Sequence, residues 1–190
     1  MELPVDPNRV AEPDRVVPNN IPCGAAPNPT LYHASVTLYA AGATLRGEAR
    51  NVPEANGWIE EEFERHRAGR SASRLDALFA GVDAADCVRF LRAQRRYDNT
   101  PIHVYRVEMA VSGRHPMALV DAVRRNRDCP DALREIIEEY WQPTREWRFW
   151  EHLGQVMTVV EELELPNAAM LAGAAHRYDL DRRRAAQLWP

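Results

Sequence analysis

Residues that could do chemistry are scattered along this chain rather than gathered in one motif. Glu151 stands between a cluster of aromatic residues and an apolar run, in the stretch 147–163, where packing alone favours a hydrophobic side chain. A fixed carboxylate stabilises positive charge, histidine and serine supply directional hydrogen bonds, and an aromatic face offers a stacking surface. The candidates are Glu151, His33, Ser71, Ser73, Arg74, Phe79 and Phe90.

The common nucleotide, hydrolase and zinc signatures are missing from the sequence. It contains no GxGxxG, GxxxxGK[ST], GxSxG or HExxH motif. Cys23, Cys87 and Cys129 are widely spaced and form no CxxC pair, so neither a disulfide framework nor a zinc site is indicated. We expect free thiols and no bound metal.

Each candidate also has a purely structural explanation, which the sequence leaves open. Glu151 fits a surface acid at a strand edge, and His33 fits a hydrogen-bonded histidine in the core or at its rim. The remaining alternatives are a turn capped by Ser71 and Ser73 with Arg74 solvated, and a core position for Phe79 and Phe90.

Length, composition and charge limit the class of protein. A chain of 190 residues with 45% hydrophobic content can bury one core. The net charge of -4 disfavours general binding to nucleic acid. No window approaches 18 uninterrupted apolar residues, and the first residues lack the pattern of a secretory signal. We therefore expect no membrane span, and either a cytoplasmic location or delivery into a target cell without a classical signal peptide.

The expected organisation is an arm, a domain and a helical end. Residues 1–29 contain seven of the 14 prolines, which predicts an extended Pro-rich arm. We expect the main domain over residues 30–165 and a C-terminal helical segment over 166–190, with a break near Asp179 as an alternative to one helix.

Strands and helices do not alternate regularly, which predicts an α+β fold with mostly antiparallel strands. In the clearest strand, Tyr105, Val107, Met109 and Val111 alternate with polar residues, as in a half-buried strand. Residues 37–49 are predicted to form a loop or turn, and Asn56 is a candidate helix cap. The expected strands are 30–35, 74–83, 102–111 and 157–165, and the expected helices are 57–69, 84–97, 116–125, 130–141 and 167–189.

Three segments, in their order, resemble the ADP-ribosyltransferase superfamily. They are LYHAS at 31–35, SRLDALFAGVDAADCVRFL at 73–91 and WEHLGQVMTVVEEL at 150–163. The resemblance implies a split, mostly antiparallel β-sheet core with flanking helices. It also implies that His33 binds the NAD ribose, that an aromatic side chain stacks on nicotinamide, and that Glu151 is the catalytic acid of a branch with a His, Tyr, Glu triad.

Two departures from that branch affect the expected function. The chain has Leu78 and Phe79 where the branch has its tyrosine, so Phe79 would supply the stacking ring. Phe149 stands two residues before the acid, where toxins that modify arginine or asparagine have Glu or Gln. The sequence therefore disfavours an arginine-targeting toxin.

The leading hypothesis is an NAD-dependent mono-ADP-ribosyltransferase of the bacterial toxin or effector type, with NAD as substrate and a protein as acceptor. Two alternatives remain open. One is a binding module with the same fold that has lost turnover. The other is an NAD glycohydrolase, which passes the ribosyl group to water. The acceptor and the oligomeric state are not indicated by the sequence.

Overall fold

Two antiparallel β-sheets and five helices make up the computed structural model, which describes residues 29–48, 54–67, 69, 72–93 and 99–190. The α+β class with antiparallel sheets is confirmed for this part of the chain. The predicted arm lies outside the described residues except for Pro29, and Ser71 and Cys23 lie outside them as well.

The larger sheet has four strands in the order β1-β4-β7-β2, and all neighbours are antiparallel. One face of this sheet is apolar. Leu31, Val107, Met157 and Val159 on that face form a buried cluster that also includes Ala80 of the other sheet. The strands are β1 (Leu31–Ser35), β2 (Thr44–Arg46), β4 (His103–Met109) and β7 (Val156–Leu163).

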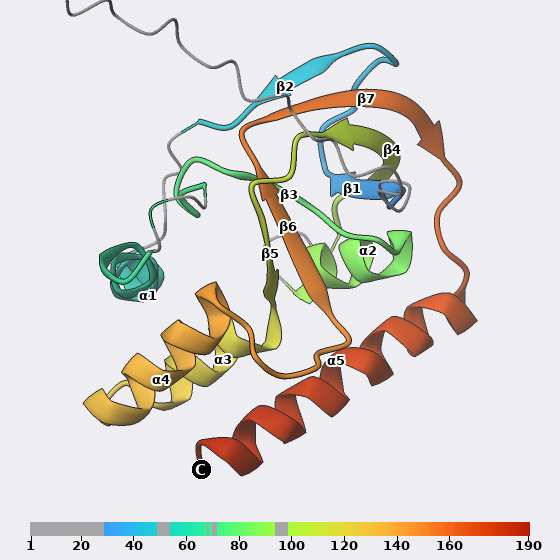
Figure 1. The fold of residues 1–190 in the computed structure, drawn as a ribbon. Coiled ribbons are helices and arrows are strands. Elements are labelled where there is room, and N and C mark those ends of the chain that lie inside the picture. The colour runs from blue at the N-terminus through green and yellow to red at the C-terminus, as the bar shows by residue number, and fades with distance from the viewer. Residues whose placement is uncertain (1–28, 49–53, 68, 70–71, 94–98) are drawn as a thin grey trace, which may run out of the picture.

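The smaller sheet has three strands in the order β3-β6-β5, and its strands run in a clearly different direction from those of the larger sheet (Figure 1). Its strands are β3 (Leu78–Ala80), β5 (Gly113–Pro116) and β6 (Trp150–Gly154). Leu153 of β6 packs in the largest core cluster with residues of four helices. Three of them are α1 (Glu54–Arg65), α3 (Ala118–Arg125) and α4 (Pro130–Trp141), and the fourth is the last helix of the chain.

Strands β6 and β7 are consecutive in the chain but belong to different sheets, with only Gln155 between them. The chain must therefore turn sharply beside Gly154. A Cβ atom on Gly154 would lie 2.6 Å from the Met109 side chain and 2.8 Å from the carbonyl oxygen of Ala110. Only glycine fits this close approach of two backbone segments.

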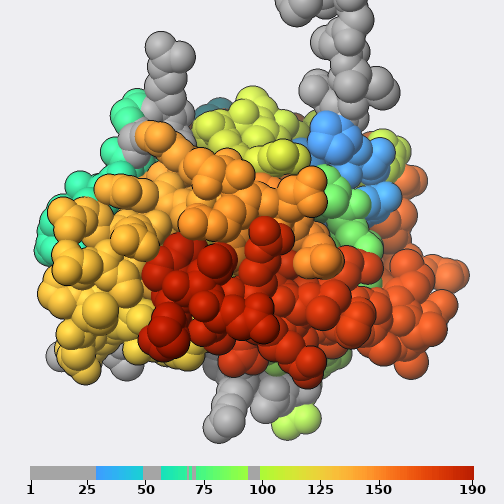
Figure 2. Space-filling model, turned by 60° about the horizontal axis from the view of Figure 1, so that its bottom comes forward, coloured from blue at the N-terminus to red at the C-terminus, as the bar shows by residue number. Residues whose placement is uncertain are grey.

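The last helix, α5 (Ala168–Leu188), lies across one face of the molecule, with α4 beside it (Figure 2). It packs against α3 and against α2 (Ala84–Ala93), and it buries Ala174, Tyr178, Asp181 and Ala185. The helix is continuous through Asp179, so the alternative of a break at this position is wrong. The Asn167 side chain caps it by accepting a hydrogen bond from the backbone N–H of Met170 at 3.0 Å.

Several local predictions differ from the structure. Helix α1 begins at Glu54, so Asn56 lies inside its first turn and is not the cap. Strand β4 ends at Met109, and Val111 is 43% exposed rather than buried. Residues 44–46, predicted as loop, form β2, and β5 was not predicted. Within the predicted strand 74–83, only Leu78–Ala80 forms a regular strand.

In the part of the chain that the structure describes, no helix is long and apolar enough to cross a membrane.

Candidate functional site

A pocket of about 270 Å³ lies where the two sheets meet α2. Four of the seven sequence-predicted site residues border it: His33 from β1, Phe79 from β3, Phe90 from α2 and Glu151 from β6. The backbones of Tyr32 and Gly81 exchange two hydrogen bonds beside it, which ties β1 to the end of β3. The fold therefore gathers side chains that are far apart in the sequence.

His33 is fixed by a hydrogen bond from its Nδ1 atom to the carbonyl oxygen of Phe79, at 2.8 Å. A carbonyl oxygen only accepts, so Nδ1 carries the proton, and in the neutral ring Nε2 is an acceptor. This bond joins the larger sheet to the smaller one at the pocket. His33 is half-buried, as expected of a side chain that lines a pocket mouth.

The two predicted aromatic residues each belong partly to the pocket and partly to the core. Phe79 packs against the largest core cluster, and the Arg74 guanidinium lies 5.3 Å from the centre of its ring. Phe90 packs against the cluster that contains Met117 and Phe149. Both rings are half-buried, so each has surface available on the pocket side as well as core contacts.

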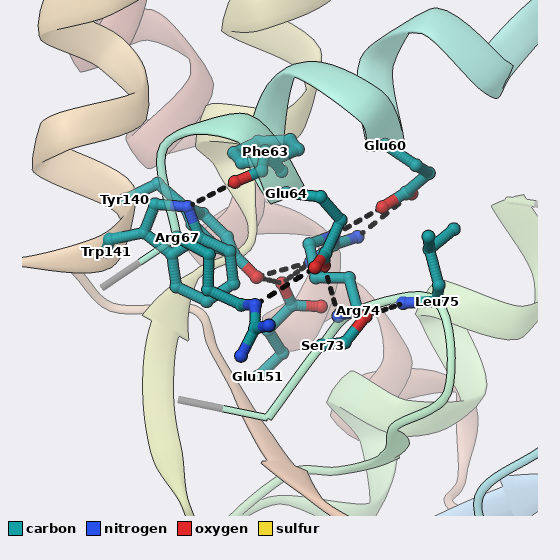
Figure 3. A network of polar contacts seen from close by, with 10 residues as sticks. All are labelled: Glu60, Phe63, Glu64, Arg67, Ser73, Arg74, Leu75, Tyr140, Trp141 and Glu151. Atoms are coloured by element: carbon teal, nitrogen blue, oxygen red, sulfur yellow. Dashed lines mark hydrogen bonds and ion pairs between the residues drawn. The ribbon is translucent and has the colours of Figure 1, made fainter. Parts of the chain in front are cut away.

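Glu151 is the centre of a buried polar network beside the pocket (Figure 3). Its Oε1 atom accepts hydrogen bonds from the Arg74 guanidinium and from the Tyr140 hydroxyl. Arg74 also bonds Glu60 through Nε at 2.9 Å. Neither Arg74, Tyr140 nor Glu60 borders the pocket, whereas Glu151 belongs to both the network and the pocket wall.

Strand geometry explains why the network forms on the side of β6 that faces the helices. Side chains two residues apart on a strand share a face, so Glu151 and Leu153 point to the same side of β6. Leu153 is fully buried against the helices, in the core cluster that includes Phe63 and Tyr140. Glu151 is only 5% exposed, so the alternative of a surface acid is wrong.

The charges in the network depend on one another. Burial raises the pKa of Glu151, although the Arg74 guanidinium and the Tyr140 hydroxyl act to lower it. Burial acts to lower the pKa of Arg74, but Glu151, Tyr140 and Glu60 hold it well above its ordinary value. Arg74 is therefore a permanent cation inside the protein.

A buried histidine supports the network from β5. His115 lies opposite Glu151 in the strand register, and its ring stacks on Tyr140 with ring centres 4.7 Å apart. Its Nδ1 atom bonds the carbonyl oxygen of Tyr140 at 2.9 Å. Burial lowers the pKa of His115 to about 4, so the ring is neutral at pH 7.

Of the remaining predicted residues, neither Ser73 nor Arg74 borders the pocket. Ser73 accepts a hydrogen bond at 3.1 Å from the backbone N–H of Leu75, as in a turn cap. Arg74 is 4% exposed, so the alternative of a solvated arginine is wrong. Ser71 lies outside the described residues.

The sequence reasoning missed Tyr140, Glu60 and His115 as neighbours of Glu151. Tyr140 stands in a helix and His115 in a short strand, and no local pattern connects either of them to Glu151. It also missed Asp86 and Cys87, which border the pocket from α2. The Cys87 thiol donates to the carbonyl oxygen of Tyr32 in β1 at 3.2 Å, whereas the Asp86 carboxylate accepts from Arg177 of α5 at 2.6 Å. In the described ranges, no group of three or more His, Cys, Asp or Glu side chains is arranged to hold a metal ion.

Comparison with models of known protein families found no match, and comparison with curated proteins found no similar sequence. A function for this chain must therefore be argued from the chemistry and geometry of the site.

Proposed function

We propose that this chain has an ADP-ribosyltransferase-like fold and is an NAD-dependent mono-ADP-ribosyltransferase of the bacterial toxin or effector type. One observation carries the proposal: His33, Phe79, Phe90 and Glu151 border a single pocket between two antiparallel sheets. These four residues come from a sequence resemblance that made no use of the pocket.

The proposed reaction breaks the bond between the nicotinamide nitrogen and C1′ of the ribose. Nicotinamide leaves with the electron pair, and positive charge develops on the ribose. A nucleophilic atom of the acceptor then bonds C1′ and gives up its proton. A carboxylate beside the ribose stabilises the charge more in the transition state than in the ground state, which is the role we assign to Glu151.

The pocket suits the reacting half of NAD. Its volume of about 270 Å³ lies just below the usual range for ligand sites, roughly 300–1,000 Å³. It would hold the nicotinamide ring and its ribose, with the rest of NAD outside. Phe79 and Phe90 supply apolar and aromatic walls for the ring, and His33 a hydrogen bond to the ribose.

A binding module without turnover is the second candidate, and one observation favours it. The Glu151 carboxylate is buried and already paired with Arg74. Such an ion pair lowers the gain from a carboxylate in the transition state, because the cation offsets part of its charge. This module would bind NAD or a related ligand and leave it intact.

The experiment measures NAD binding by calorimetry and then nicotinamide release, with wild type, Glu151→Gln and a control variant. We expect Glu151→Gln to lower nicotinamide release by about 100-fold or more, because the charge is lost while the size is kept. Glu161→Gln, at an exposed position of β7, should retain wild-type turnover.

Three outcomes separate the candidates. Labelling of a protein in a lysate with NAD that carries a labelled adenosine half supports the transferase. Nicotinamide release without such labelling supports an NAD glycohydrolase. NAD binding without release supports the binding module, and absence of NAD binding to the wild type rejects the proposal.

A further inference from the structure

The Glu151 carboxylate is held by only one of its two oxygen atoms. Oε1 accepts hydrogen bonds from Arg74 and Tyr140. Oε2 is buried and has no hydrogen-bond partner among the described residues. A buried carboxylate oxygen without a partner is costly, so such an atom needs an explanation in function or structure.

The network restrains the orientation of the carboxylate from two directions. Arg74 is itself fixed by Glu60 and lies 5.1 Å from the ring centre of Phe63, so its guanidinium has little freedom. Tyr140 is fully buried between the rings of Phe63 and His115. Both donors therefore reach Oε1 from rigid positions, and the orientation of Oε2 is set as a result.

We infer that Arg74 and Tyr140 are positioning residues, which hold Glu151 by Oε1 and leave Oε2 to accept a hydrogen bond from a ligand hydroxyl in the adjoining pocket. This inference rests on the proposed function, in which that hydroxyl belongs to the NAD ribose. The inference changes the expected role of Arg74, because its guanidinium would contact Glu151 and not NAD.

The charged and titratable groups around Glu151 act in opposite directions. Arg74 and the Tyr140 hydroxyl stabilise the ionised carboxylate, whereas Glu60 opposes ionisation as a like charge. The groups that face the network are Glu60 and Glu64 from α1, Arg74 from the segment before β3, Tyr140 from α4 and His115 from β5.

The test compares two variants that should move the acid limb of the activity profile in opposite directions. Tyr140→Phe removes a hydrogen bond to the ionised carboxylate and should raise the pH of half-maximal nicotinamide release by about one to two units. Glu60→Gln removes a like charge and should lower that pH. Tyr178→Phe is the matched control, because Tyr178 is another buried tyrosine that donates to a carboxylate, that of Asp121, at 2.8 Å.

A second measurement does not depend on turnover. Titration of the Glu151 carboxyl by carbon NMR, assigned with Glu151→Gln, should give the same opposite shifts in Tyr140→Phe and Glu60→Gln. Arg74→Lys, which keeps the charge but loses the planar fork, should lower the maximal rate by at least tenfold while the dissociation constant for NAD stays within threefold.

The outcomes distinguish this inference from the proposed function. Opposite shifts by NMR in a protein that releases no nicotinamide would support positioning and reject the enzyme. If the wild type releases nicotinamide but the Glu151 titration does not shift in the two variants, or shifts in the same direction in both, the inference is overturned and the proposed function stands.

Discussion

The carboxylate of Asp181, in the last helix, accepts a hydrogen bond of 2.9 Å from the backbone N–H of Phe149, at the entry to β6. The same oxygen accepts a bond of 2.8 Å from the N–H of Arg148. Asp181 is completely buried. Helix α5 therefore fixes the backbone two residues before Glu151, and the C-terminal segment helps to build the site.

Asp181→Ala should lower the free energy of unfolding by about 2–4 kcal/mol, because one buried and one partly buried N–H group lose a charged acceptor. Urea denaturation followed by far-UV circular dichroism measures the change. Asp179→Ala is the control, since Asp179 is exposed on the same helix and should change stability by less than about 0.5 kcal/mol. Equal stabilities for the two variants would mean that the Asp181 contacts do not stabilise the fold.

A chain that ends at Pro166 should not fold cooperatively. The truncation removes Ala174, Tyr178 and Ala185 from the core, and it removes Trp189, which packs in the largest core cluster. We expect the shortened chain to lose its thermal transition and to bind an apolar dye. A cooperative melt close to that of the full chain would instead make α5 a separate unit.

The regular parts of the fold were predictable from local pattern. From Tyr105 to Glu108, strand β4 alternates buried and less buried side chains, so Tyr105 and Val107 were placed correctly, although Val104 on the opposite face is buried as well. Helix α4 starts at Pro130, the usual place for proline in a first turn. Failures occurred where distant contacts decide the structure. Strands β2 and β5 are short and exist through pairing with β7 and β6.

Boundary errors have local physical causes. Val111 follows the alternation of β4, but the chain leaves the larger sheet after Met109 to enter the smaller one. Glu54 and Ala55 are good helix formers, so α1 starts before Asn56.

The candidate site was predictable only as a set of positions. Only the resemblance implied a strand at Glu151, since the expected strand began at Met157, and Glu151 does lie in a strand, β6. Its contacts with Arg74 and Tyr140 join three distant segments, and no periodicity encodes which residue meets which. The burial of Arg74 was missed for this reason, since an arginine beside serines usually predicts a solvated turn.

The stability of the protein should fall between pH 6.5 and pH 4 because of His115. Burial lowers the pKa of His115 from 6.5 to about 4, so the unfolded chain binds a proton in this range and the folded chain does not. The shift corresponds to roughly 3 kcal/mol at most, lost as the pH falls. Burial lowers the pKa of His152 too, which adds to the effect.

Asp86 acts against this trend, because burial raises its pKa to about 6 and its protonation stabilises the folded state below that pH. The comparison that isolates His115 is His115→Asn, whose amide can still donate to the Tyr140 carbonyl. Its stability should depend less on pH than that of the wild type, measured by urea denaturation at several pH values. His66→Asn is the control, because Nδ1 of His66 also bonds a backbone carbonyl, at 3.1 Å, but the side chain is exposed. The same slope in His115→Asn and the wild type would contradict the assignment.

His33→Ala and Phe79→Ala should both weaken NAD binding, and Phe79→Ala should destabilise the protein more. His33 borders the pocket and bonds a backbone oxygen, whereas Phe79 borders the pocket and also packs in the core. Removal of a partly buried phenyl ring should cost about 2–3 kcal/mol, below the cost at a fully buried site. His103→Ala is the matched control, because His103 also lies in a strand but does not border the pocket. Calorimetry with NAD and urea denaturation on the same samples separate the two effects. Equal NAD affinity in His33→Ala and His103→Ala would remove His33 from the site.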